Sequence, residues 1–192
     1  VHVVALAGGS GTRFWPMSQK AIPKQLLRLF GSETMLEATL SRVADIKLKN
    51  VDSIHQWAVV GASHAAACKK LPGLSATEIL VEPRGRNTAA AIALACTHIR
   101  ARDPKALMVV LPADHHVTDD QTFRLLLAEA IDVASRGAIV TLGIKPTGPE
   151  IGYGYLESGH EDPRGGIKVL RFYEKPDIST AKTFFESGKF FW

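Results

Sequence analysis

Cysteine and long apolar runs are both scarce in this 192-residue chain. The two cysteines, Cys68 and Cys96, are too few for a disulfide framework, and we expect both thiols to be buried and reduced in a cytosol. No run reaches the roughly 18 apolar residues that a membrane-spanning helix needs. No basic stretch precedes the first apolar run and no small-residue cleavage site follows it, so we expect no signal peptide, no membrane partner and a cytoplasmic location.

A strong excess of one charge is also missing. The formal net charge is +4, from 23 Lys and Arg against 19 Asp and Glu, and the basic residues are dispersed. Such a balance fits an anionic ligand and does not predict a nucleic-acid partner. With 46% hydrophobic residues, the chain can bury a core of its own.

Short apolar runs alternate with helix-like stretches along residues 1–144, which predicts an α/β fold with right-handed crossovers. Runs of this kind are typical of strands buried on both faces of a parallel sheet. The expected strands are Val1–Leu6, Trp57–Val60, Glu78–Val81, Leu107–Leu111 and Ala138–Ile144. Three helices are expected. The first follows the capping-box spelling Thr34-x-x-Glu37, the second runs from Asn87 to Arg100, and the third carries the apolar stripe Phe123, Leu127 and Ile131.

Beyond residue 144, glycine and proline become frequent. Tyr153–Leu156 and Ile167–Tyr173 read as less buried, antiparallel strands, and a helix over Ile178–Ser187 is expected between Asp177 and Gly188. The sequence stops at the apolar letters KFFW, from which we expect a C-terminally incomplete domain. We divide residues 1–192 into a nucleotide-binding core, 1–144, and a sugar-phosphate-binding part, 145–192.

A glycine-rich turn follows the first expected strand, in the letters LAGGSGTRFWP. In α/β sheets, ligands bind at the carboxyl ends of strands, where small residues let backbone N–H groups approach a phosphate. The dinucleotide pattern fails because Phe14 stands where its third glycine belongs, and the Walker pattern fails for want of a lysine. Arg13 can grip phosphate oxygens with two N–H groups, and Lys20 and Lys24 can reach the same region.

Two further strands are followed by polar residues. A lone aspartate such as Asp114 is usually a turn or cap residue, although its place after a buried strand also allows a ligand role. A zinc site on His115 and His116 is rejected, because adjacent histidines lack the spacing of zinc ligands. Asn87 can cap a helix, bind a ligand, or do both.

Five stretches together resemble the sugar-1-phosphate nucleotidylyltransferases, most specifically the mannose-1-phosphate guanylyltransferases found alone or as the first domain of bifunctional isomerases. They are LAGGSGTRFWPMSQKAIPKQLL (6–27), VEPRGRNTAAAIALA (81–95), VLPADHHV (110–117), GIKPTGPEIGYGYLE (143–157) and FYEKPD (172–177). The resemblance covers the chain nearly end to end. It implies the Rossmann-like nucleotide-diphospho-sugar transferase fold, in which helices flank a mixed, mainly parallel sheet.

The resemblance also implies a reaction, the transfer of GMP from GTP to mannose-1-phosphate with Mg²⁺ as cofactor. Catalysis would rest on Arg13, Lys24 and Asp114, with Asp114 as the metal ligand. Nucleotide binding is implied for Ala7, Gly8, Gly9, Gly11, Thr12, Arg13, Glu82 and Asn87. Sugar-phosphate binding is implied for Gly152, Tyr153, Gly154, Glu174 and Lys175. A homodimer is compatible with this interpretation.

One departure and two alternatives stay open. Gln19 stands where the family commonly has arginine, which removes one positive charge near the phosphates. Another nucleotide and sugar, such as UTP or dTTP with glucose-1-phosphate, is the alternative within the same enzyme class. A nucleotide-sensing subunit without turnover is the alternative outside it, and retention of the charged set argues against it.

Overall fold

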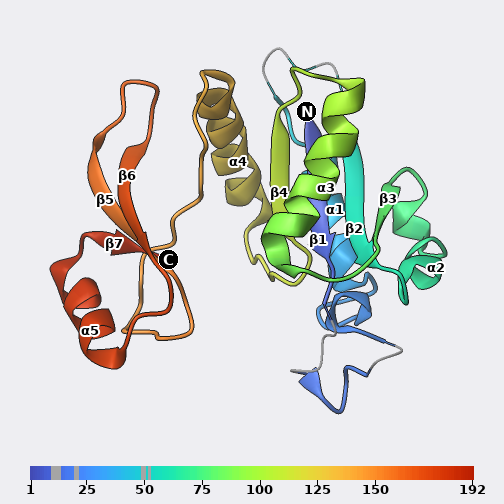
Figure 1. Cartoon of the computed structure of the whole chain (residues 1–192), viewed down its shortest axis with the longest axis horizontal. Coiled ribbons are helices and arrows are strands. Elements are labelled where there is room, and N and C mark those ends of the chain that lie inside the picture. Colours follow the sequence, from blue (N-terminus) through green and yellow to red (C-terminus); the bar gives the residue numbers. More distant parts are fainter. Residues whose placement is uncertain (10–13, 20–21, 49–50, 52) are drawn as a thin grey trace. The chain divides into compact units, whose positions relative to one another are not determined.

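The computed structural model describes residues 1–9, 14–19, 22–48, 51 and 53–192. The chain divides into two compact units, Val1–Ala128 and Glu129–Trp192. The division falls inside helix α4 (Asp120–Ser135). Each unit is described by itself, and Figure 1 labels the elements of both.

The first unit is built on a four-stranded parallel sheet. Its strands are β1 (His2–Ala7), β2 (His55–Gly61), β3 (Glu78–Glu82) and β4 (Met108–Pro112), in the order β3-β2-β1-β4. Leu6 pairs with Pro112, and Gly61 pairs with Glu82. The carboxyl ends of all four strands therefore lie at one edge, where the segments that follow them can meet.

Both faces of this sheet are buried. Val4, Trp57 and Val59 face α3 (Asn87–Arg102) and pack against its Ala91, Ala95 and Ile99. Side chains of the opposite face are buried too, and α1 (Met35–Ala44) lies against β1 (Figure 1). The expected α/β fold, with helices flanking a parallel sheet, is confirmed. The described residues of this unit also form the short elements η2 (Lys24–Leu26), α2 (Ala65–Cys68) and η3 (Pro72–Leu74).

The start of α1 has the capping box that the sequence predicts. The Thr34 hydroxyl accepts from the Glu37 N–H at 3.2 Å, and the Glu37 carboxylate accepts from the Thr34 N–H at 2.9 Å. The second Glu37 oxygen accepts from the Gly73 N–H at 3.1 Å, which ties η3 to α1. Burial raises the pKa of Glu37, but these hydrogen bonds outweigh it and hold the pKa below its usual value.

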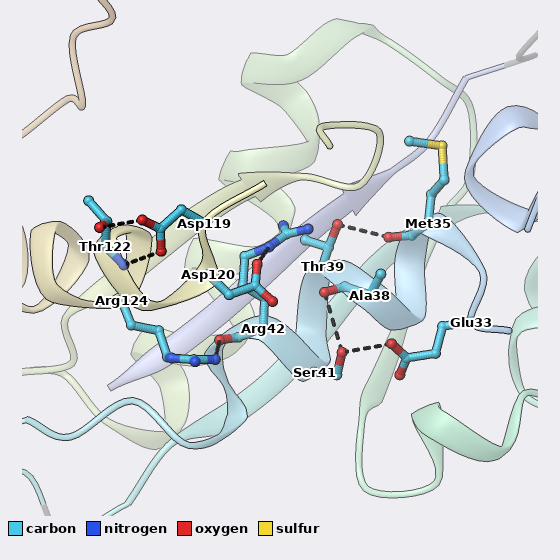
Figure 2. A network of polar contacts seen from close by, with 10 residues as sticks. All are labelled: Glu33, Met35, Ala38, Thr39, Ser41, Arg42, Asp119, Asp120, Thr122 and Arg124. Carbon is cyan, nitrogen blue, oxygen red and sulfur yellow. Dashed lines mark hydrogen bonds and ion pairs between the residues drawn. The ribbon is translucent and has the colours of Figure 1, made fainter. Parts of the chain in front are cut away.

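A second polar network fastens the beginning of α4 to α1 (Figure 2). The buried Arg42 donates from Nε to Asp120 Oδ1 at 2.8 Å, and Arg124 donates to the Arg42 carbonyl at 3.0 Å. Asp119 accepts from the Thr122 N–H at 2.9 Å, as an N-cap does. The segment that follows β4 is therefore anchored at Asp120, six residues beyond Asp114.

The second unit contains an antiparallel sheet and a helix. β5 (Tyr155–Glu161) lies between β6 (Ile167–Tyr173) and β7 (Phe190–Phe191), and α5 (Ile178–Ser187) precedes β7. Tyr155, Ala181 and Phe184 form its buried cluster. As expected, Asp177 caps α5 through the Thr180 N–H at 2.8 Å, and Gly188 ends it with a φ of 66°.

Two expectations are wrong. Residues 138–144, all of them described, form no strand, and Ile139 is fully exposed. A strand needs a neighbour along its length; here Ile144 pairs with Trp192 through two backbone hydrogen bonds. Cys68 is buried as expected, whereas Cys96 lies on the exposed side of α3.

Within the described ranges, no helix has the length and apolar character to cross a bilayer.

Candidate functional site

Two charged side chains that are distant in sequence meet at the carboxyl edge of the parallel sheet. Lys24 Nζ lies 3.1 Å from Asp114 Oδ2. Asp114 follows β4 by two residues, as the sequence predicts, and Lys24 opens η2. The lysine side chain is 22% exposed and the aspartate side chain 45%, so both can be reached by a ligand.

The residue after Lys24 contacts the neighbouring strand. Gln25 is buried and donates from Nε2 to the Ala7 carbonyl at 2.5 Å. Ala7 ends β1, and the Ala113 N–H donates to the Leu6 carbonyl at 3.1 Å, which holds the ends of β1 and β4 together. Consecutive residues of η2 thus reach the ends of two adjacent strands.

Gly8 and Glu82 lie against each other at the same edge. A Cβ on Gly8 would stand 2.5 Å from Glu82 Oε2, so only glycine allows this approach. Glu82 ends β3 and is 7% exposed, and its carboxylate has no hydrogen-bond partner among the described residues. A carboxylate with acceptor capacity left over at this edge can accept hydrogen bonds from a ligand.

Gly9, the next residue in the turn, has a φ of 104°, a conformation that favours glycine. The predicted ligand residues Gly11, Thr12 and Arg13 lie outside the described residues, as does Lys20.

Asn87 does not act as the helix cap that one reading of the sequence predicts. Helix α3 begins at Asn87 itself, its N-cap is Arg86, and no side chain accepts a capping hydrogen bond. Asn87 adopts a φ of 63°, which asparagine tolerates better than most residues. Its exposed side chain is left to other partners, and its predicted role in nucleotide binding stays a prediction.

Aromatic rings lie beside the charged pair. The Phe14 ring lies beneath Lys24 Nζ, 4.4 Å from its centroid. His116 stacks on Phe30 with centroids 3.9 Å apart, which joins the segment after β4 to the segment after η2. Across the described residues, no group of three or more His, Cys, Asp or Glu side chains is arranged to hold a metal ion. A cation at Asp114 would need further oxygen ligands from outside these described side chains.

The second unit carries the residues predicted for the sugar phosphate. Glu174 and Lys175 form an ion pair at 2.7 Å, and both side chains are more than 60% exposed. A Cβ on Gly154 would lie 3.6 Å from Glu174 Oε2, so these two residues are neighbours. Gly152 donates to Glu150 Oε1 at 2.9 Å, and Tyr153 is half exposed with its ring against Trp192.

A sequence model of the family described as nucleotidyl transferase matches residues 2–192. The chain belongs to the nucleotidyl transferase family.

Relatives within this nucleotidyl transferase family match nearly the whole chain. Xanthan biosynthesis protein XanB of Xanthomonas campestris pv. campestris is 41% identical over 98% of this chain and 40% of its own length. Mannose-1-phosphate guanylyltransferase of Escherichia coli K12 is 38% identical over 100% of this chain and 41% of its own. The chain therefore spans about two fifths of the length of these curated relatives.

A solved structure gives the same result for the fold. The crystal structure from Thermus thermophilus described as mannose-1-phosphate geranyltransferase superposes with a TM-score of 0.85 at 35% identity. It covers 100% of this chain and 54% of the solved one. The α/β fold of this nucleotidyl transferase is thus shared along the entire sequence.

Two residues of this nucleotidyl transferase were not singled out from its sequence. Gln25 holds the end of β1, and its only signal was its position next to Lys24. Tyr155 is fully buried, and its hydroxyl contacts the backbone N–H and carbonyl of Glu150 at 2.9 and 3.0 Å. It anchors the loop that contains Gly152 and Gly154, although the sequence marked it only as part of a strand.

Proposed function

We propose that this chain is the catalytic part of a mannose-1-phosphate guanylyltransferase, which transfers GMP from GTP to mannose-1-phosphate. A phosphate oxygen of the sugar attacks the α-phosphorus of GTP, and the bond from that phosphorus to the β-phosphate oxygen breaks. GDP-mannose and pyrophosphate are the products. The observation that carries the proposal is the contact of Lys24 with Asp114 at the carboxyl edge of the parallel sheet.

Reactions of this type need positioning and charge neutralisation more than covalent help from the protein. The Lys24 ammonium is held beside Asp114 at the carboxyl edge of the sheet, where it would face charge that builds on the phosphates. Arg13, assigned to the same phosphates by family resemblance, follows the glycine turn. Because guanidinium donates through two parallel N–H groups, it suits two phosphate oxygens at once.

The Asp114 carboxylate fits a magnesium ion that the substrate helps to hold. Magnesium prefers oxygen ligands and often takes one or two carboxylates together with phosphates. Asp114 supplies one partly exposed carboxylate next to a lysine, so the carboxylate could bind the metal while the ammonium faces phosphate oxygens. When bound, the ion would supply positive charge to the α-phosphate and the leaving pyrophosphate.

Guanine selection is assigned to Glu82. Its carboxylate is buried beside Gly8 and has acceptor capacity left over within the described residues. Guanine carries donors at N1–H and at its amino group, whereas adenine lacks a donor at the first of these positions. Ala7, Gly8 and Gly9 would meet the base through the backbone, and Asn87 lies at the start of the helix that follows β3.

The sugar phosphate is assigned to the second unit. Lys175 would hold the phosphate, Glu174 would accept from sugar hydroxyls, and the loop with Gly152, Tyr153 and Gly154 would contact the sugar. The ion pair of Glu174 and Lys175 is exposed, so a ligand can exchange for either partner at small cost. Involvement in polysaccharide biosynthesis, a homodimer and a cytoplasmic location are further parts of this proposal.

The test is pyrophosphate release by the full-length protein across a panel of GTP, ATP, UTP and dTTP, each with mannose-1-phosphate and glucose-1-phosphate. We expect turnover with GTP and mannose-1-phosphate to exceed every other pair. Preference for UTP or dTTP with glucose-1-phosphate would replace the proposal by its nearest rival. Tight GTP binding without turnover would identify a nucleotide sensor instead.

A further inference from the structure

The short turn η2 places two consecutive side chains on two different strands. Lys24 contacts Asp114 after β4, and Gln25 contacts Ala7 at the end of β1. The turn itself is attached to α1, because the Met35 N–H at the start of α1 donates to the Leu27 carbonyl at 3.0 Å. Pro23, which precedes the turn, is fully buried. The contacts of Lys24 and Gln25 are therefore made from a turn that α1 holds in place.

The Gln25 contact fixes the orientation of a peptide group. In a trans peptide the carbonyl and the following N–H point in opposite directions within one plane. With the Ala7 carbonyl held by Gln25 Nε2 at 2.5 Å, the Gly8 N–H is turned away from η2. Gly8 has no side chain to hold it, and the next residue, Gly9, has a φ of 104°. Ala7 is in register with Val60 of β2, so the strand ladder also restrains this peptide, and Gln25 adds a second restraint on its carbonyl.

We propose that Gln25 is the positioning residue of the nucleotide-binding turn, and that it acts by locking the Ala7–Gly8 peptide in the orientation that the nucleotide needs. The inference rests on the proposed function, since it assumes that Gly8 faces the nucleotide. Gln25 acts through the backbone and is buried at 5% exposure. Losing its donor leaves the Ala7 carbonyl to the β1–β2 ladder alone, and the Ala7–Gly8 peptide is then held less firmly before a ligand arrives.

The chain offers a matched control for this contact. Gln56 also donates from Nε2 to a backbone carbonyl, that of Leu40, at 3.0 Å. It lies near the amino end of β2, away from the edge where Gly8, Glu82 and Asp114 lie. The two glutamines make the same kind of contact to a backbone carbonyl, and Gln56 Oε1 also accepts from the Thr77 hydroxyl at 3.4 Å.

The experiment compares Gln25→Met and Gln25→Glu with Gln56→Met and Gln56→Glu in the full-length protein. Both replacements keep the length of the side chain and remove the donor, and the Glu replacement also adds a negative charge, so the uncharged Met variant decides the result. For the Gln25 variants we expect the KM for GTP to rise by about tenfold and the KM for mannose-1-phosphate to stay within about twofold. The dissociation constant of GTP, measured by calorimetry without the sugar, should rise by the same factor. The Gln56 variants should leave all three values at the wild-type level.

Equal changes in both KM values, or no change in GTP affinity, would overturn the inference. If both Gln25 variants fail to fold while both Gln56 variants fold, Gln25 is a residue of the core and the inference is also overturned. A wild-type protein that turns over no nucleotide with any sugar phosphate would instead defeat the proposed function, before any variant is compared.

Discussion

The two units hold their charged residues in different ways. In the first unit, Lys24 and Asp114 are 90 residues apart in sequence and meet because strand ends and an anchored turn bring them together. In the second unit, Glu174 and Lys175 are neighbours in sequence, and both extend into solvent. The first pair is a product of the tertiary fold, and the second is a local feature of the segment after β6.

This difference teaches where preorganisation lies. The start of the turn after β1 is bounded by Gln25 and Glu82, two side chains from two other segments. In the second unit, the loop before β5 is held by Tyr155, whereas Lys175 contacts its own neighbour. We therefore expect changes in the first unit to affect turnover strongly, and changes to the exposed pair to affect mainly the binding of one substrate.

The largest effect is expected for Asp114→Asn in the full-length protein. The variant keeps the shape of the side chain and removes the charge that we assign to the metal. Turnover of GTP with mannose-1-phosphate should fall by roughly 100-fold or more. The matched control is Asp103→Asn, an exposed aspartate before β4 at the opposite end of the strand. Equal activity of the two variants would remove Asp114 from the site.

The second largest effect on activity is expected for Gly8→Ala. The new Cβ would stand 2.5 Å from Glu82 Oε2, so either the turn or the carboxylate must move. We expect the KM for GTP to rise by about tenfold or more, because a close approach to the base is lost. Gly85→Ala is the control, since nothing lies within 4 Å of the added carbon. An unchanged KM in both variants would show that Gly8 and Glu82 do not face the nucleotide.

For Lys175→Ala we expect a smaller and selective effect. The KM for mannose-1-phosphate should rise by about tenfold, as for the loss of one charge-assisted contact, while the KM for GTP stays unchanged. Lys182→Ala on α5 removes an exposed lysine of the same unit and should change neither value. A rise in the KM for GTP with Lys175→Ala would contradict the division of the substrates between the two units.

Glu37→Gln should leave activity nearly unchanged and lower stability. Glu37 accepts from the Thr34 and Gly73 N–H groups, and the variant offers only one carbonyl oxygen, so the free energy of unfolding should fall by about 1–3 kcal/mol. Glu33→Gln is the exposed control beside the same helix. Thermal or urea unfolding measures the difference, and equal stability of the two variants would contradict the role of Glu37.

The same residue predicts a pH dependence. Because the pKa of Glu37 is lowered in the folded state, the unfolded chain binds its proton more tightly than the folded protein. The stability from the ionised carboxylate is complete above its ordinary pKa of 4.5 and is lost as the pH falls through the lower folded-state pKa. Unfolding curves of wild type and Glu37→Gln should therefore converge as the pH falls below 4.5.

Local features of the fold followed from the sequence with little error. The capping box of Thr34 and Glu37, and the start and end of α5 at Asp177 and Gly188, depend on residues within one turn of each other. The parallel strands were also predicted, because buried apolar runs and helical stripes alternate. The meeting of Lys24 with Asp114 could be anticipated from the rule that neighbouring parallel strands end at one edge.

Other features of the fold and the site could not be predicted in this way. The hydrophobic run at 138–144 reads as a strand, but the structure pairs only Ile144, with Trp192. Asn87 has the residue type of a cap, yet its backbone adopts a positive φ and the helix begins with it. Gln25 and Tyr155 hold backbone groups whose positions only the folded chain defines.

A crystal structure of the full-length protein with GTP and Mg²⁺ would decide whether the carboxyl edge of the parallel sheet is the nucleotide site. We predict the triphosphate against the turn that follows Ala7, with Lys24 Nζ and the Asp114 carboxylate turned toward the α-phosphate and its metal. A triphosphate bound elsewhere, with Lys24 and Asp114 still paired to each other and no phosphate within reach of either, would contradict the proposed catalytic centre.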